Sequence, residues 1–180
     1  MRESSKASLC GVISALSVVI MLSTYLSPFL VYTAPAFAGL LLIIVVNELG
    51  YKWSLGTFIC ISILSFFIIS DKEASVFYTL FFGYYPVFVL FIEKSISNTV
   101  LKHIAEFVVF NASCILSVVL CYYFFGISLE DFDSSDYLYN IIFVLLLNIM
   151  CFVYTNLINK LQILYKKRFR SFFRKMFNLK

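Results

Sequence analysis

Residues 7–47 read ASLCGVISALSVVIMLSTYLSPFLVYTAPAFAGLLLIIVVN, which is two long apolar runs divided by the short break LSP. About 20 helical residues cross the roughly 30 Å hydrocarbon core of a bilayer, and each run has about that length. Both runs are continuous rather than alternating, which favours lipid-spanning helices over barrel strands. So short a break forces the two helices into an antiparallel hairpin.

The rest of the chain has the same character. Of its 180 residues, 62% are hydrophobic and 13% are charged, against about 45–50% and about 25% in a soluble domain. A water-soluble core of this length cannot hide so much apolar side chain, so the lipid bilayer is the expected surrounding. We therefore predict an all-α polytopic membrane protein, with a compact bundle of six transmembrane helices within residues 1–159. The predicted spans are approximately 7–27, 29–47, 53–70, 74–92, 104–125 and 137–159.

The basic residues predict the orientation. With a cytoplasmic N-terminus, every Lys and Arg except Lys72 falls in an inner loop or in the tail at 160–180. By the positive-inside rule both termini are then cytoplasmic. The tail is expected to be a basic amphipathic helix that anchors this topology or lies on the anionic leaflet. Nucleic acid is not an expected partner, because the basic side chains are interleaved with lipid-seeking aromatics. The excess of Phe, Ile, Tyr and Asn indicates the cell membrane of a low-GC Gram-positive bacterium.

A strip of small residues marks the first predicted helix. Ala7, Gly11 and Ala15 fall four residues apart, so on a helix they line up on one side. Membrane helices associate by close packing, which small side chains permit. The strip is therefore either a docking surface for another membrane protein or a contact with another helix of the same chain.

A second group of residues lies where the predicted helices reach the outer face. Lys72 is the one basic residue expected there, which makes it a natural partner for a ligand carboxylate or phosphate, or for Glu73. Asp71 and Glu73 equally suit a helix cap, and interfacial tyrosines often form an aromatic belt. Because these side chains converge on one face, a pocket is a reasonable hypothesis. The candidate substrate-binding residues are Tyr32, Asp71, Lys72, Glu73, Tyr78, Tyr85, Tyr137 and Asn140.

Two further features are expected inside the spans. Gly83 and Pro86 stand mid-span in FFGYYPVF and predict a kink in the fourth helix. Glu48 and Glu106 are expected near the inner ends of their helices, where they reach water or pair with a neighbouring lysine. No carboxylate is expected nearer the midplane, which counts against a proton-driven pump.

The motifs of common enzymes are absent from the sequence. It has no HExxH, no GxSxG and no Walker loop. The cysteines lie in apolar runs without a CxxC pair and are expected to be small buried hydrophobes, and a single His is too few for a zinc cluster. We expect no enzyme and no bound cofactor or metal. A chain without a nucleotide site either takes energy from partners or does no work.

Six helices in about 180 residues, with both ends inside and a first helix that begins with a basic residue and ASLCGVISALS, resemble a known membrane family. The pattern is similar to the substrate-binding S components of energy-coupling factor (ECF) vitamin transporters. The resemblance implies that Ala7, Gly11 and Ala15 dock on a transmembrane coupling (T) subunit driven by cytoplasmic ATPases. It also implies that a small-molecule substrate is held at the outer face. Gly11 stands where the family often has Ala.

Two interpretations without a ligand stay open. One is a non-transporting membrane scaffold of a cell-envelope complex, similar to the MreD family of cell-shape proteins, which also packs six short helices. The other is an accessory subunit of a larger membrane complex. A ligand-binding chain predicts a pocket of roughly several hundred Å³ at the outer helix ends, whereas a scaffold predicts an interior filled by Phe and Leu.

Overall fold

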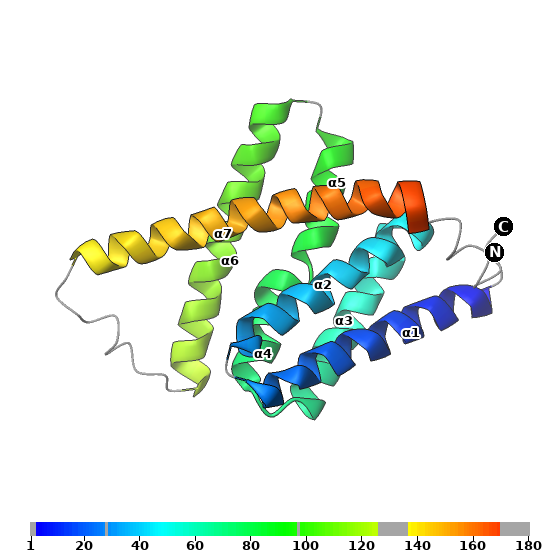
Figure 1. Ribbon diagram of the computed structural model, residues 1–180, viewed down its shortest axis with the longest axis horizontal. Coiled ribbons are helices and arrows are strands. Elements are labelled where there is room, and N and C mark those ends of the chain that lie inside the picture. Colours follow the sequence, from blue (N-terminus) through cyan, green and yellow to red (C-terminus); the bar gives the residue numbers. More distant parts are fainter. Residues whose placement is uncertain (1–2, 28, 97, 126–136, 170–180) are drawn as a thin grey trace.

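The computed structural model describes residues 3–27, 29–96, 98–125 and 137–169. In that part of the chain every regular element is a helix and no strand is present (Figure 1). The all-α prediction is therefore confirmed for the described residues. The elements are, in order, α1 (Glu3–Leu22), η1 (Ser23–Leu26), α2 (Leu30–Leu49), α3 (Tyr51–Ile68), α4 (Lys72–Phe77), η2 (Tyr78–Phe82), α5 (Tyr85–Ser95), α6 (Thr99–Phe125), α7 (Tyr137–Leu164) and η4 (Tyr165–Phe169).

Among the described residues, four helical segments are long and apolar enough to cross a membrane. They are Glu3–Leu26, Leu30–Leu49, Tyr51–Ile68 and Lys72–Ser95, and they correspond to the first four predicted spans. The fold is thus consistent with a multi-pass membrane protein. α6 and α7, of 27 and 28 residues, occupy the positions of the fifth and sixth predicted spans. That these two helices also cross the membrane stays a prediction, as does the orientation of the termini.

The predicted basic amphipathic tail is described only in part. α7 continues to Leu164, and the π-helix η4 follows as far as Phe169. Tyr165 is buried, and its hydroxyl donates to Glu48 Oε1 at 3.2 Å, which fixes the start of η4 against the end of α2. Residues 170–180 lie outside the described part of the chain.

α2 is the central helix of the first half of the chain. It packs against α1, α3, α4, η2, α5 and α7. Gly50 alone forms the turn into α3, and its φ of 88° lies in the left-handed region that a β-carbon disfavours. Its N–H donates to the Val46 carbonyl at 3.1 Å and closes the helix end. This one-residue turn places α3 antiparallel beside α2 (Figure 1).

α4 and α5 belong to one membrane-length segment that is interrupted near its middle. The interruption is the π-helix η2, where the Gly83 N–H donates to the Tyr78 carbonyl at 2.7 Å. Pro86 follows in the first turn of α5, where its missing N–H costs little. The kink predicted from Gly83 and Pro86 is confirmed. Because π-helical turns are frequent at functional sites, the packing around η2 is a natural place to seek one.

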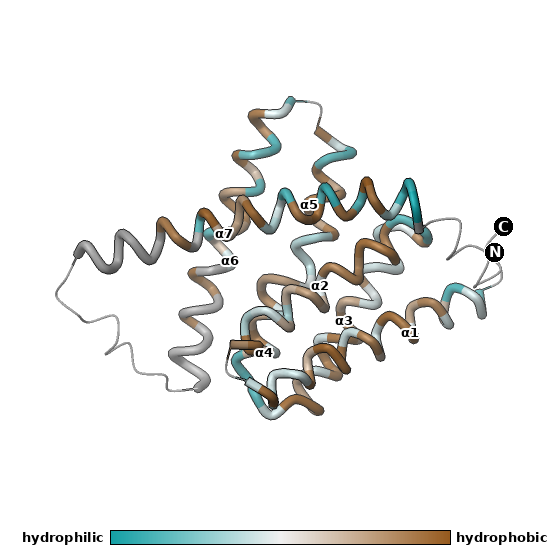
Figure 2. The backbone as a smooth tube through the Cα atoms, in the orientation of Figure 1, coloured by the Kyte–Doolittle hydropathy of each residue, from teal (hydrophilic) through white to brown (hydrophobic). Residues whose placement is uncertain are grey.

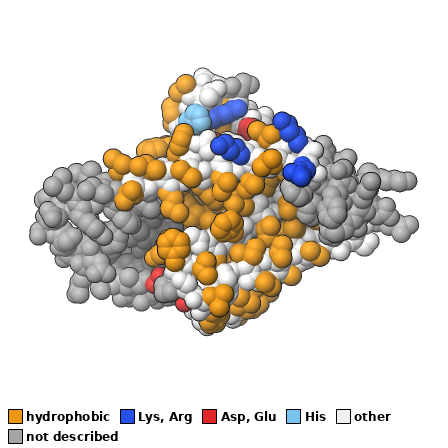
Figure 3. Space-filling view, viewed as in Figure 1, with side chains coloured by type: hydrophobic (Ala, Val, Ile, Leu, Met, Phe, Trp, Pro, Cys, Tyr) orange, Lys and Arg blue, Asp and Glu red, His pale blue; other side chains and the backbone are white. Residues whose placement is uncertain are grey.

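The outward faces of the helices are apolar. Val19, Phe67 and Phe152 are 61%, 84% and 66% exposed. Apolar positions recur along the helices in Figure 2, and hydrophobic side chains cover most of the described face in Figure 3. Lysines and the histidine gather toward one margin of that face, where α6 begins and α7 ends. A lipid surrounding accepts such a surface, whereas water would drive it to associate.

Candidate functional site

Lys72 is engaged by the protein itself. Its ammonium nitrogen donates to the Phe66 carbonyl at 2.6 Å and to the Ile69 carbonyl at 2.9 Å. These carbonyls end α3 and have no further turn to bond, so Lys72 acts as a C-terminal cap. Asp71 occupies the N-cap position of α4, but its side chain makes no capping hydrogen bond. The neighbouring Glu73 lies in the first turn of α4, where its charge favours the helix dipole.

The predicted substrate-binding tyrosines whose side chains are described differ in their exposure. Tyr32 is 49% exposed, and its ring meets the Phe77 ring edge-on at 5.2 Å between centroids. Tyr78 and Tyr85 are fully buried instead. Tyr137 and Asn140 fall in the first turn of α7, but their side chains lie outside what the structure describes.

A hollow of about 390 Å³ lies elsewhere, on the outward side of α6. It is open, and Val100, His103, Ile104 and Phe107 line it. Of the candidate substrate-binding residues whose side chains the structure describes, none belongs to that lining, and Tyr78 and Tyr85 lie in the interior instead.

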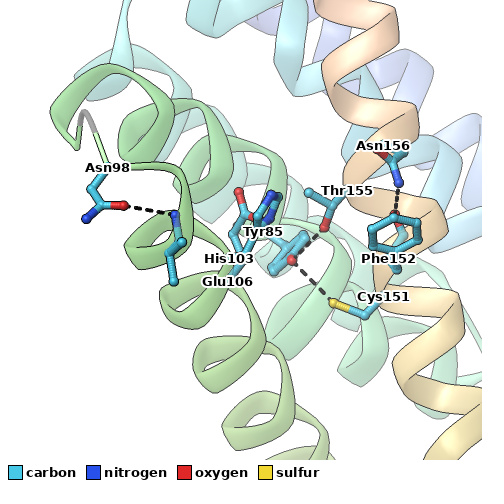
Figure 4. Close-up of polar contacts among 9 residues, drawn as sticks. Tyr85, Asn98, His103, Glu106, Cys151, Phe152, Thr155 and Asn156 are labelled. Carbon is cyan, nitrogen blue, oxygen red and sulfur yellow. Dashed lines mark hydrogen bonds and ion pairs between the residues drawn. The ribbon is translucent and has the colours of Figure 1, made fainter.

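The polar group that the structure does assemble lies where α5, α6 and α7 meet (Figure 4). The Tyr85 hydroxyl, at the start of α5, is 2.9 Å from Thr155 Oγ1 and 3.4 Å from Cys151 Sγ, both on α7. On α6, His103 Nδ1 is 3.2 Å from Glu106 Oε2. Tyr85, Cys151 and Thr155 are buried, and so is Glu106. The Tyr85 bonds cross from α5 to α7, and buried polar bonds of this kind hold two helices together, whereas the His103–Glu106 pair lies within α6.

Aromatic rings fill the space around this group. Phe81 of η2 meets Phe110 of α6 at 4.4 Å between ring centroids, and Tyr85 stacks against Tyr154 of α7 at 5.9 Å. The Tyr154 hydroxyl donates to the Ala36 carbonyl of α2 at 3.2 Å. The interior between α2, η2, α6 and α7 is thus packed with rings rather than hollow among the described residues.

One buried hydroxyl in the same region has no hydrogen-bond partner in the described part of the chain. It is that of Tyr78, the first residue of η2, whose ring lies 6.1 Å from that of Phe58. The number of residues along the fourth span places Tyr78 toward the outer face. That number gives the depth of a residue in the span, but not the side of the helix on which its ring lies.

The small-residue strip faces outward. Ala7, Gly11 and Ala15 are all exposed, and a β-carbon added to Gly11 meets no described atom within 4 Å. The opposite side of α1 carries the buried Leu9 and Ile13. Of the two interpretations of the strip, contact with another helix of this chain is not what the described residues show.

Two polar contacts fix α1 with this side outward. The Ser17 hydroxyl donates to the Ala38 carbonyl of α2 at 3.4 Å. Lys6 holds Glu3 at 2.8 Å, and its ammonium lies 5.5 Å from the centroid of the Trp53 ring on α3. Such a cation–π contact ties the first turns of α1 and α3 together, so the rotation of α1 is set by its neighbours.

No protein-family model, curated protein or solved structure matches this chain. The class that the fold itself defines is an all-helical protein with several membrane-length apolar helices.

Proposed function

We propose that this chain is a membrane-embedded subunit of the ECF S-component type, which docks through α1 on a transmembrane coupling subunit. The observation that carries the proposal is the open strip formed by Ala7, Gly11 and Ala15. Lipid tails are as apolar as leucine, so a bare strip gains nothing from lipid and gains close packing from a partner helix.

The proposed topology is six spans with both termini cytoplasmic. Two features support it: successive helices run in opposite directions, and basic side chains gather where α6 begins and α7 ends (Figure 3). The start of α1 and the end of α7 lie toward the same end of the molecule (Figure 1), as an even number of crossings requires. In this arrangement the chain is multi-pass in the bacterial cell membrane, and the basic residues of η4 face anionic lipid.

In the S-component form of the proposal, a small molecule is captured at the outer face. The subunit then tilts in the membrane while cytoplasmic ATPases of the partner complex supply the energy. The candidate contacts are those predicted from the sequence; among those whose side chains are described, Tyr32, Asp71, Lys72 and Glu73 keep at least part of the residue accessible.

A second candidate function is a non-transporting scaffold or accessory subunit of a cell-envelope complex. The filled interior favours it, because Phe81, Phe110 and Tyr154 occupy the space that a ligand would need. This form uses the same α1 surface for assembly and needs no substrate.

The test of docking is affinity purification of the tagged protein from its native membranes after replacing Gly11 and Ala15 by Leu. The matched control is Val12→Leu, which changes an exposed neighbour on the same helix. We expect a coupling subunit with its ATPases to co-purify with wild type and control but not with the Leu variants. Unchanged co-purification would refute docking by the strip. Native mass spectrometry of the wild type separates the two forms, because the S-component form predicts a retained small molecule.

A further inference from the structure

The junction between α7 and η4 is attached to the ends of α2 and α5. Tyr165, the first residue of η4, is buried, and its hydroxyl donates to Glu48 Oε1 of α2 at 3.2 Å. Gln162, one turn earlier, donates its amide nitrogen to Glu93 Oε2 of α5 at 2.8 Å in the amide orientation that satisfies both of its neighbours. In that orientation its oxygen accepts from Lys166 Nζ at 3.0 Å. The start of η4 is therefore fixed to two other helices.

This attachment presents the positive charges of η4 outward. Lys166, Lys167 and Arg168 are all exposed, while the adjacent Tyr165 is buried. Within the described part of the chain, neither Lys167 nor Arg168 forms a hydrogen bond or an ion pair through its side chain. The two carboxylates to which the junction is attached already accept hydrogen bonds from the chain itself. Lys167 and Arg168 thus lack a counter-charge among the described residues and can receive an anion from outside.

An exposed apolar surface comes directly before these charges. Ile163 and Leu164, the last two residues of α7, are 52% and 51% exposed. At about 1.5 Å of rise per residue, they lie within about 8 Å of Arg168 along the helix axis. Apolar surface followed by fixed positive charge matches the two ends of an anionic phospholipid, which has apolar acyl chains and a negative phosphate. A soluble anion would leave Ile163 and Leu164 in contact with water.

We propose that the junction of α7 and η4 is a binding site for an anionic phospholipid. The acyl chains lie against Ile163 and Leu164, and the phosphate accepts hydrogen bonds from Lys167 and Arg168. The guanidinium of Arg168 offers two parallel N–H donors, a geometry that fits phosphate better than a single ammonium does. This inference rests on the proposed topology and narrows the contact of η4 with the bilayer to one site and one class of lipid. It does not depend on docking through α1.

The test is native mass spectrometry of the whole protein in detergent, titrated with phosphatidylglycerol or with phosphatidylcholine of the same acyl chains. We expect the wild type to prefer phosphatidylglycerol. Arg168→Gln should weaken phosphatidylglycerol binding about fivefold, and Lys167→Gln combined with Arg168→Gln roughly 25-fold, whereas phosphatidylcholine binding stays unchanged. The matched control is Lys102→Gln, which removes one positive charge near the start of α6, apart from η4 (Figure 1), and should keep the wild-type preference.

Two results would overturn the proposal. One is equal binding of the two lipids to the wild type, or a preference that Lys102→Gln lowers as much as Arg168→Gln does. The other is complete displacement of phosphatidylglycerol by excess glycerol 3-phosphate, because the site would then take a soluble headgroup without using the apolar surface. Circular dichroism and size-exclusion chromatography of the variants exclude misfolding as the cause of weaker binding. The measurement needs neither a coupling subunit nor a membrane orientation, so its failure is distinguishable from a failure of docking or of the topology.

Discussion

Replacing Gly39 by Ala tests the packing of α2 against the π-helix η2. A β-carbon at Gly39 would overlap the Phe82 carbonyl oxygen, lie 2.9 Å from the Phe82 carbonyl carbon and come within 3.1 Å of the Tyr154 hydroxyl. Carbon atoms pack at about 3.5–4.0 Å, so the backbones must move apart by more than half an ångström. The neighbour is backbone, which cannot swing away as a flexible side chain does.

The expected cost follows from three contributions. Overpacking costs roughly 1–3 kcal/mol, and a weakened Tyr154 hydrogen bond adds about 0.6 kcal/mol in a membrane protein. The change from Gly to Ala inside a helix offsets about 1 kcal/mol. The net loss of roughly 1–3 kcal/mol corresponds to about 2–4 °C of Tm per kcal/mol in a chain of this size. We therefore expect Gly39→Ala to lower the Tm by roughly 2–12 °C.

The assay is thermal unfolding of the detergent-solubilised protein, with Gly11→Ala and Gly56→Ala as matched controls. No described atom lies within 4 Å of an added β-carbon at either control position. Both controls therefore gain helix propensity without a clash and should raise the Tm by about 2–4 °C. If Gly39→Ala raises the Tm as the controls do, α2 and η2 do not approach closely enough for a β-carbon at Gly39 to overlap the Phe82 backbone.

Two further substitutions probe the polar contacts around the interrupted segment. Lys72→Met removes the cap on the Phe66 and Ile69 carbonyls and should speed amide hydrogen exchange at the end of α3. The control Lys94→Met changes an exposed lysine and should leave that exchange unchanged. Equal exchange rates in the two variants would contradict the capping role of Lys72. Tyr85→Phe removes the bond to Thr155 and should lower the Tm by about 1–4 °C, for a bond worth about 0.6–1 kcal/mol, and an unaltered Tm would show that this hydroxyl contributes nothing to stability.

The sequence predicted the positions of the helices well because apolar run length is measured against a fixed bilayer thickness. Gly83 and Pro86 likewise predicted the interruption between α4 and α5, because both residues disturb the hydrogen-bond ladder of a helix. These are local signals along the chain, and they do not depend on which helices meet.

The rotation of each helix was not predictable in the same way. In a soluble protein the polar face of a helix points to water, but here both the lipid and the interior are apolar. Tyr78 and Tyr85 were therefore assigned to the outer face and are buried, and Glu106 was assigned to water or to a neighbouring lysine and is instead buried beside His103. Only the contacts of neighbouring helices fix these directions, and no single-sequence pattern encodes them.

Photo-crosslinking from α1 in native membranes tests the docking surface most directly. A photoreactive side chain at Ser8, an exposed residue bordering the strip, is compared with one at Val19, which is 61% exposed farther along α1. The account predicts that position 8 crosslinks to one transmembrane coupling protein and that Gly11→Leu abolishes the product. Crosslinks from position 8 to lipid alone, or equal protein crosslinks from positions 8 and 19, would contradict it.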